Sequence, residues 1–202
     1  MLFNTIDFIF FLPVVVIIYY SLSQKGRWIL LLLASYFFYG SWKLNYLAFI
    51  VISTLIDYAC GLKMDKVDSK EKKRPFLILS LVSNLGLLFF FKYYNFFAYN
   101  LNSGISSNFP ILENVILPVG ISFYTFQTLS YSVDVYHGRQ KAESHLGYFA
   151  LYVSFFPQLV AGPIERFSNL TPQFKTEKRL NYENISNGLR LILFGLFVKM
   201  VI

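Results

Sequence analysis

Charged residues and cysteines are scarce in this chain. Charged residues make up 14% of the sequence, whereas hydrophobic residues make up 55% and aromatic residues 20%, and the mean hydropathy is +0.50. Because an ordinary soluble domain carries about 25% charged residues, this composition indicates a membrane protein. The single cysteine, Cys60, excludes a disulfide framework and a CxxC metal site, and we expect it to be a packing residue.

Motifs of the common enzyme classes are also missing. The sequence contains no HExxH, GxSxG, Walker or GxGxxG pattern. The two histidines, His137 and His145, lie eight residues apart in a charged stretch, where a histidine is most often solvated. The sequence therefore predicts no metal site.

Long runs without charge divide the chain into candidate membrane helices. A helix needs about 20 apolar residues to cross a bilayer, and shorter runs fit where the bilayer thins or neighbouring helices accommodate them. We expect a polytopic all-α membrane protein of about six to seven hydrophobic helices, in a single domain over residues 1–202. The last run is still apolar at Ile202, which predicts an incomplete domain. The candidate spans are 8–24, 28–42, 44–62, 75–91, 114–133, 146–164 and 189–202.

The net charge of +7 is interpreted as membrane topology and not as a nucleic-acid site. Residues 63–74 contain six Lys or Arg, and the positive-inside rule makes them the best candidate for a cytoplasmic loop. On that topology a full crossing by residues 146–164 would place Arg166 and the basic residues after it outside, against the rule. One of the two late segments is therefore expected to be broken or re-entrant around its proline and glycine residues.

Polar side chains in apolar segments carry the remaining signal. Residues 117–140 contain many hydroxyls, and in a membrane these face either neighbouring helices or a polar passage. The amide of Gln127 suits packing and cavity lining equally. Asp57 lies within a span and is expected to pair with a polar neighbour. The polar segment 167–187 is expected to form a loop with a short interfacial helix.

Two strings resemble a known family. LPVGISFYTFQTLSYSVDVYHGR and FFPQLVAGPIERF closely resemble the signature region of the membrane-bound O-acyltransferase family, in the branch that includes the alginate O-acetylation membrane protein and bacterial exopolysaccharide acetyltransferases. The stretches MLFNTIDFIFFLPVVVIIYY, LLLLASYFFYGSWKLNYL and FFFKYYNFF resemble earlier elements of the same branch. The resemblance implies a funnel-shaped fold in which a buried histidine assists acyl transfer across the membrane.

The function implied by this resemblance is acetyl transfer to a polysaccharide. A cytoplasmic donor, either an acetyl thioester or an acyl-carrier protein, would serve as co-substrate without any bound cofactor. The acceptor would be a hydroxyl of an extracellular or cell-wall polysaccharide such as alginate. The resemblance places the protein in the bacterial inner membrane, with the lipid bilayer and other envelope acetylation proteins as partners.

The catalytic histidine of the family is not expected in this chain. Its strings, which resemble WRRWHISL and LWHG and belong to the C-terminal half, do not occur here. His137 follows DVY, where relatives typically carry a basic residue such as Arg, and does not inherit the role. Whether the chain is itself an enzyme therefore stays open. The alternatives are a non-catalytic truncated membrane scaffold, a D-alanyl transferase relative acting toward teichoic acid, and, less favoured, a transporter.

Two groups of residues remain candidates for substrate contact, and structural support is the alternative for each. The expected lining of the tunnel, or its support, consists of Tyr124, Gln127, Gln158, Gly162 and Pro163. The second group is expected at the cytoplasmic mouth, where basic side chains suit phosphate or an acidic partner and loop salt bridges are the alternative. It consists of Asp134, His137, Arg139, Lys141 and Arg166.

Overall fold

The regular elements of the computed structural model are helices throughout the residues that it describes, which are 1, 3–105, 108–112, 117–159 and 162–201. Parts of three predictions lie outside these residues: positions 114–116 of the fifth span, positions 160–161 of the sixth, and the end at Ile202. In chain order the helices are α1 (Ile6–Ser21), α2 (Gln24–Gly40), α3 (Leu44–Asp65), α4 (Lys70–Leu88), η1 (Phe89–Tyr93), α5 (Tyr94–Ile105), α6 (Ile121–Tyr136), α7 (Leu146–Ser154), α8 (Phe156–Leu159), α9 (Phe167–Lys175) and α10 (Tyr182–Val201).

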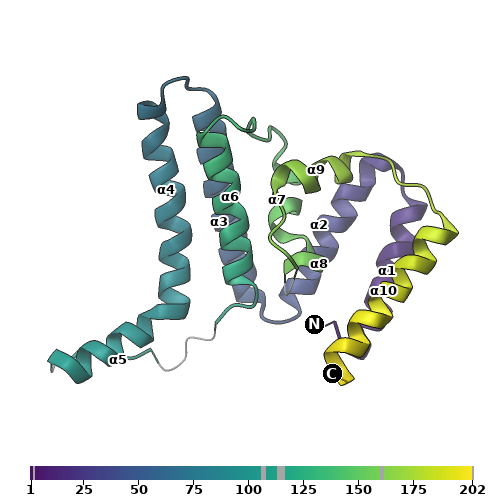
Figure 1. Ribbon diagram of the computed structural model, residues 1–202, viewed down its shortest axis with the longest axis horizontal. Helices are drawn as coiled ribbons and strands as arrows, with labels where there is room; N and C mark the ends of the chain where they lie inside the picture. Colours follow the sequence, from purple (N-terminus) through teal and green to yellow (C-terminus); the bar gives the residue numbers. More distant parts are fainter. Residues whose placement is uncertain (2, 106–107, 113–116, 160–161, 202) are drawn as a thin grey trace.

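The helices form a bundle of three and a second group beside it (Figure 1). Helices α3, α4 and α6 all pack against one another, while α2 contacts α1, α3 and α7 and so joins the two groups. Helix α4 passes through the π-helical turn η1 into α5, which leaves the bundle at an angle (Figure 1). The sequence analysis expected no helix where α5 lies.

Apolar side chains cover much of the outer surface. Phe10 on α1 is 70% exposed and Leu191 on α10 is 72% exposed. In water such faces mark interaction sites or aggregation, whereas in a bilayer they contact lipid. Two helices, Leu44–Asp65 and the continuous helix Lys70–Gly104, are long and apolar enough to cross a membrane. The all-α architecture is confirmed, and the six to seven crossings stay a prediction.

The basic connection is shorter than the sequence suggested. Helix α3 runs on to Asp65 and α4 begins at Lys70, so residues 66–69 alone connect them. Lys and Glu are good helix formers, and the charged residues on either side continue the helices toward solvent. Most of the expected loop 63–74 therefore belongs to the C-terminal end of α3 and the N-terminal end of α4.

The chain reverses its direction between α7 and α9, as Figure 1 shows. Helix α7 ends at Ser154, and the four-residue α8 follows before the chain returns to α9. The Nζ of Lys175 on α9 lies 2.6 Å from a carboxylate oxygen of Glu143, which precedes α7. Both ends of the segment therefore lie at the same end of the molecule, as the expected re-entrant geometry requires. Its depth in a membrane stays a prediction.

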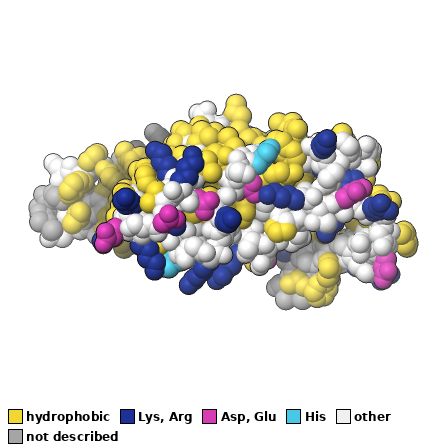
Figure 2. Space-filling model, turned by 90° about the horizontal axis from the view of Figure 1, so that it is seen from above, with side chains coloured by type: hydrophobic (Ala, Val, Ile, Leu, Met, Phe, Trp, Pro, Cys, Tyr) yellow, Lys and Arg dark blue, Asp and Glu magenta, His cyan; other side chains and the backbone are white. Residues whose placement is uncertain are grey.

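The charged side chains gather at this same end. The α3–α4 connection, the α6–α7 connection and α9 all lie at the top of Figure 1. Figure 2 looks down on that end and shows Lys and Arg side chains spread across it among fewer acidic ones. Arg27, in contrast to these surface side chains, is buried. Its guanidinium donates to the carbonyl oxygen of Lys178 and lies 4.7 Å from the ring centre of Tyr19.

Candidate functional site

Helix α6 starts at a glycine that no other residue can replace without strain. Gly120 has φ of 75°, in the left-handed region that favours glycine. A Cβ atom at this position would also overlap the carbonyl oxygen of Leu159 in α8. The glycine therefore holds the first turn of α6 directly against the α7–α8 segment, so that one face of α6 borders that segment.

Farther along α6, Thr128 and Ser132 enter a buried polar cluster that α6 shares with α3 and α4. Both side-chain oxygens of Asp57 accept from the Nδ2 of Asn84 at 2.8 Å, and one also accepts from the Oγ of Ser80 at 2.6 Å. From α6, Thr128 donates to the Oδ1 of Asn84 at 3.1 Å, and Ser132 lies 2.8 Å from the Oγ of Ser80. We call these five residues the polar cluster.

The polar cluster explains several hydroxyls of the α6 sequence. Its five side chains are nearly or completely inaccessible to solvent, and buried polar groups are stable when they are hydrogen-bonded. The pairing expected for Asp57 is present. Thr125 lies one turn before Thr128, and its buried hydroxyl has no hydrogen-bond partner among the described residues. Interhelical contact is therefore the role of Thr128 and Ser132.

The face of α6 toward α7 carries Gln127 and Tyr131. The Nε2 of Gln127 donates to the carbonyl oxygen of Tyr152 at 2.9 Å. The hydroxyl of Tyr152 lies 3.1 Å from the carbonyl oxygens of both Gln127 and Glu165. Tyr131 packs 4.7 Å from the ring centre of Phe149. In this structure the Gln127 amide connects α6 to α7, and a direct substrate contact by this amide stays a prediction.

The other tunnel candidates lie near this same junction. Tyr124 is 1% exposed, and neither its hydroxyl nor the Oε1 of Gln158 has a hydrogen-bond partner within the described chain. The backbone N–H of Gly162 donates to the carbonyl oxygen of Gln158 at 3.0 Å, whereas Pro163 is exposed. Tyr124 and Gln158 thus keep free polar atoms, while Gly162 shapes the backbone turn.

The mouth candidates all lie at or near the charged end. Asp134 and Arg139 form an ion pair of 3.5 Å whose arginine is 63% exposed, and such exposed pairs contribute little to stability. A ring nitrogen of His137 lies 2.9 Å from the carbonyl oxygen of Val133, so this histidine caps its own helix. Lys141 and Arg166 are exposed.

Three residues at the charged end were missed by the sequence analysis. Gln140, Thr171 and Lys175 line a common cavity with the first turn of α9. Each is ordinary in the sequence, because hydroxyl, amide and lysine side chains are frequent at polar surfaces. What distinguishes Gln140 and Thr171 is a buried polar atom without a hydrogen-bond partner in the described structure, and no sequence pattern reports that.

Comparison with known proteins finds relatives along the whole chain. The chain is 40% identical, over 236 aligned residues, to a peptidoglycan O-acetyltransferase of Helicobacter pylori and covers 44% of that protein. It is 38% identical to the "Probable alginate O-acetylase AlgI" of Pseudomonas syringae pv. tomato and of Pseudomonas aeruginosa, covering 39% of each. In all three alignments 100% of this chain is included.

These relatives support the resemblance drawn from the sequence. Along its whole length the chain is related to alginate and peptidoglycan O-acetylases, which are of the membrane-bound O-acyltransferase type. It spans about two fifths of the length of the curated relatives that it matches. No family model matches the sequence, and no solved structure matches it either. The resemblance drawn from the two α6 and α7–α9 strings is thereby confirmed.

Proposed function

We propose that this chain is part of an enzyme that transfers acetyl groups from a cytoplasmic donor to hydroxyls of an extracellular or cell-wall polysaccharide. The observation that carries the proposal is the alignment of the entire chain with O-acetylases named for alginate and for peptidoglycan. Its exposed apolar helices support a place in a membrane, which we take to be the bacterial inner membrane.

The chemistry of acetyl transfer suits an enclosed passage across a membrane. A sugar hydroxyl is a weak nucleophile and needs a general base, and the acyl carbonyl gains from fixed hydrogen-bond donors. Exclusion of water protects the thioester from hydrolysis. We assign the base to a histidine of the C-terminal half of the whole protein, and to this chain the support of the passage.

Two parts of the structure support this division of roles. Tyr124 on α6 and Gln158 on α8 carry buried polar atoms without hydrogen-bond partners among the described residues, and they are proposed to contact the acceptor or the acyl group. Arg139 and Lys141 lie on the α6–α7 connection and Arg166 immediately precedes α9, and this charged end is proposed to receive the donor or its carrier protein. Asp134 and His137 position that surface.

A chimera tests the proposal directly. Residues 1–202 replace the aligned segment of the Pseudomonas aeruginosa alginate O-acetylase in a strain that lacks its own copy. We expect acetylated alginate to return, measured as O-acetyl groups per uronic acid. A matched chimera that also carries Tyr124→Phe, which removes one hydroxyl, is expected to lower acetylation about tenfold, since such losses are worth about 1.5 kcal/mol.

Peptidoglycan is the second candidate acceptor, because one relative is named for it. The same replacement in the Helicobacter pylori protein, scored by acetylated muropeptides, compares the two acceptors. Chimeras that accumulate in the membrane at normal levels but acetylate neither polymer would contradict the proposal and favour a non-catalytic scaffold. Transfer of D-alanine instead of acetyl would favour the teichoic-acid alternative.

A further inference from the structure

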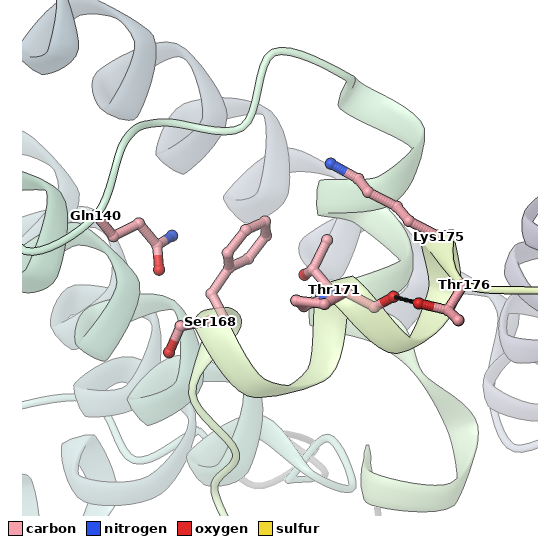
Figure 3. Close-up of a pocket in the computed structure, with 7 residues that line it drawn as sticks. Gln140, Ser168, Thr171, Lys175 and Thr176 are labelled. Atoms are coloured by element: carbon pink, nitrogen blue, oxygen red, sulfur yellow. Dashed lines mark hydrogen bonds between the residues drawn. The ribbon is translucent and has the colours of Figure 1, made fainter.

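A cavity of about 480 Å³ lies beside α9 at the charged end of the molecule. Figure 3 shows Gln140 on the connection after α6, facing the helix from which Thr171 and Lys175 project. We call this space the α9 cavity. Its lining consists of Gln140, Phe167, Ser168, Thr171, Pro172, Lys175 and Thr176.

Two buried donors at the α9 cavity lack acceptors in the described structure. They are the Nε2 of Gln140 and the hydroxyl of Thr171, whose residue is 2% exposed. Buried polar groups without partners are rare in native proteins and call for an explanation. The nearby hydroxyl of Thr176, in contrast, donates to the carbonyl oxygen of Pro172 at 2.8 Å (Figure 3). Two residues that line the cavity thus hold buried donors that no described residue satisfies, and that a ligand bringing acceptors would satisfy.

The charges at the α9 cavity favour an anion. Among the described residues that line the cavity, Lys175 is positively charged and none is acidic. Its ammonium has three donors, of which one is used on Glu143 at 2.6 Å, so two remain. The two segments that form this region, 134–145 and 165–179, contain six Lys or Arg against four Asp or Glu.

We propose that the α9 cavity binds a phosphate ester through Gln140, Thr171 and Lys175. A phosphate group presents several acceptor oxygens and a negative charge in a compact volume, which matches two neutral donors and one ammonium. The phosphate belongs either to a soluble ester or to a lipid headgroup. As a site for the acyl donor, the cavity rests on the proposed function, because the donor would then carry its acyl group on a phosphorylated molecule.

Ligand-dependent stabilisation of the purified 202-residue chain tests the site without any acetylation. The chain is held in maltoside micelles, and its thermal unfolding is followed with inorganic pyrophosphate, against sodium chloride of equal ionic strength. A ligand that binds the folded state raises the unfolding temperature in a saturable way. We expect such a saturable rise with pyrophosphate and none with chloride.

Two variants assign the effect to the cavity. Thr171→Val keeps the shape of the side chain and removes the donor, and Gln140→Leu removes the amide. Each is expected to weaken the apparent affinity about tenfold, the loss expected for one charge-assisted hydrogen bond. Gln173→Leu is the matched control, because Gln173 lies on the same helix outside the α9 cavity, and it should bind as the unchanged chain does. Circular dichroism confirms that each variant is folded.

The two sources of phosphate are separated by a lipid arm. Micelles containing phosphatidic acid replace pyrophosphate, with diacylglycerol as the uncharged control. Stabilisation that is lost in Thr171→Val with either ligand supports the site, and the ligand that binds more tightly names the source. The proposal is overturned if neither ligand gives saturable stabilisation. It is also overturned if the ligands stabilise Thr171→Val and Gln140→Leu as much as they stabilise the unchanged chain.

The outcomes of this experiment and of the chimera are independent. Phosphate binding without polysaccharide acetylation would leave the site standing and sink the proposed function. If the chimera acetylates the polysaccharide but the chain binds no phosphate, the proposed function would stand and the phosphate site would fail. The cavity would then be a structural feature of the turn before α9.

Discussion

The polar cluster and the α9 cavity contain similar side chains in different states. Each combines a threonine hydroxyl, a carboxamide and an ionisable group. In the polar cluster the Asn84 amide and the Thr128 hydroxyl are both hydrogen-bonded, whereas at the α9 cavity the Nε2 of Gln140 and the hydroxyl of Thr171 are buried without partners in the described structure. The first arrangement joins helices, and the second is open to a ligand.

The difference teaches that pairing, and not composition, separates structural from functional polar groups. A paired buried hydrogen bond adds about 1 kcal/mol to stability, whereas an unpaired buried group costs about 1–3 kcal/mol. Substitutions in the polar cluster should therefore reduce stability, and isosteric apolar substitutions at the α9 cavity should not. Four predictions follow this comparison from the largest change to the smallest.

Asp57→Ala is expected to have the largest effect. It leaves the Oγ of Ser80 and the Nδ2 of Asn84 without their shared acceptor, and we expect the free energy of unfolding to fall by about 3 kcal/mol. Denaturant unfolding in micelles, followed by tryptophan fluorescence, measures the change. Asp65→Ala, at the exposed end of the same helix, should change stability by less than about 0.5 kcal/mol. Equal losses in the two variants would contradict the role of the polar cluster.

Gly120→Ala tests the junction through which α6 reaches the α7–α8 segment. Its positive φ and the close approach of the Leu159 carbonyl both oppose a Cβ, and the expected loss is about 2 kcal/mol. Gly138→Ala is the matched control, because its φ is also positive at 69° but a Cβ would meet nothing within 4 Å. We expect that control to lose about 1 kcal/mol. If the two losses were the same, the contact with Leu159 would have no energetic consequence.

Thr128→Val removes the donor to the Oδ1 of Asn84 and keeps the side-chain shape. The expected loss is about 1 kcal/mol, the usual value for one buried hydrogen bond, and the same unfolding measurement applies. In combination with Asn84→Ala the losses should not add, because both variants break the same bond. Additive losses would show that the hydrogen bond between Thr128 and Asn84 does not contribute to stability.

Thr171→Val makes the same chemical change at the α9 cavity and should change stability least. The hydroxyl of Thr171 has no hydrogen-bond partner among the described residues, so we expect the free energy of unfolding in ligand-free micelles to stay within about 0.5 kcal/mol of its original value, or to rise. A loss as large as that of Thr128→Val would show that this hydroxyl is paired in the folded protein, and the contrast between the two regions would disappear.

The extent to which the sequence predicted the fold differs between segments. The helical character of residues 44–62 followed from a long apolar run, and the structure places α3 there. A broken or re-entrant course was expected for one of the two segments 114–133 and 146–164, without a choice between them, and the structure shows α7 end at Ser154 before the short α8. Helix α5 belongs to none of the candidate spans, because the charge-free run of the fourth span ends at Phe91, before Lys92.

The candidate site was predicted only in part. Polar residues of α6 were recognised from their contrast with the apolar run, yet Gln127 pairs with the backbone of Tyr152, and Tyr124 keeps an unpaired hydroxyl. These two outcomes could not be distinguished beforehand, because the partner lies on another helix. Asp57 was expected to pair, and the identity of Ser80 and Asn84 as its partners came from the packing of α3 against α4.

The sequence by itself determined the apolar composition, the helical class, the clustering of basic residues and the family resemblance, because composition, periodicity and short motifs are local properties of the chain. The tertiary structure decided which polar groups are satisfied. Hydrogen bonds in this protein join residues that are distant in the sequence, such as Asp57 and Asn84, or Arg27 and Lys178. Such pairs depend on how helices pack, and the same packing leaves the Nε2 of Gln140 and the hydroxyl of Thr171 buried without hydrogen-bond partners among the described residues.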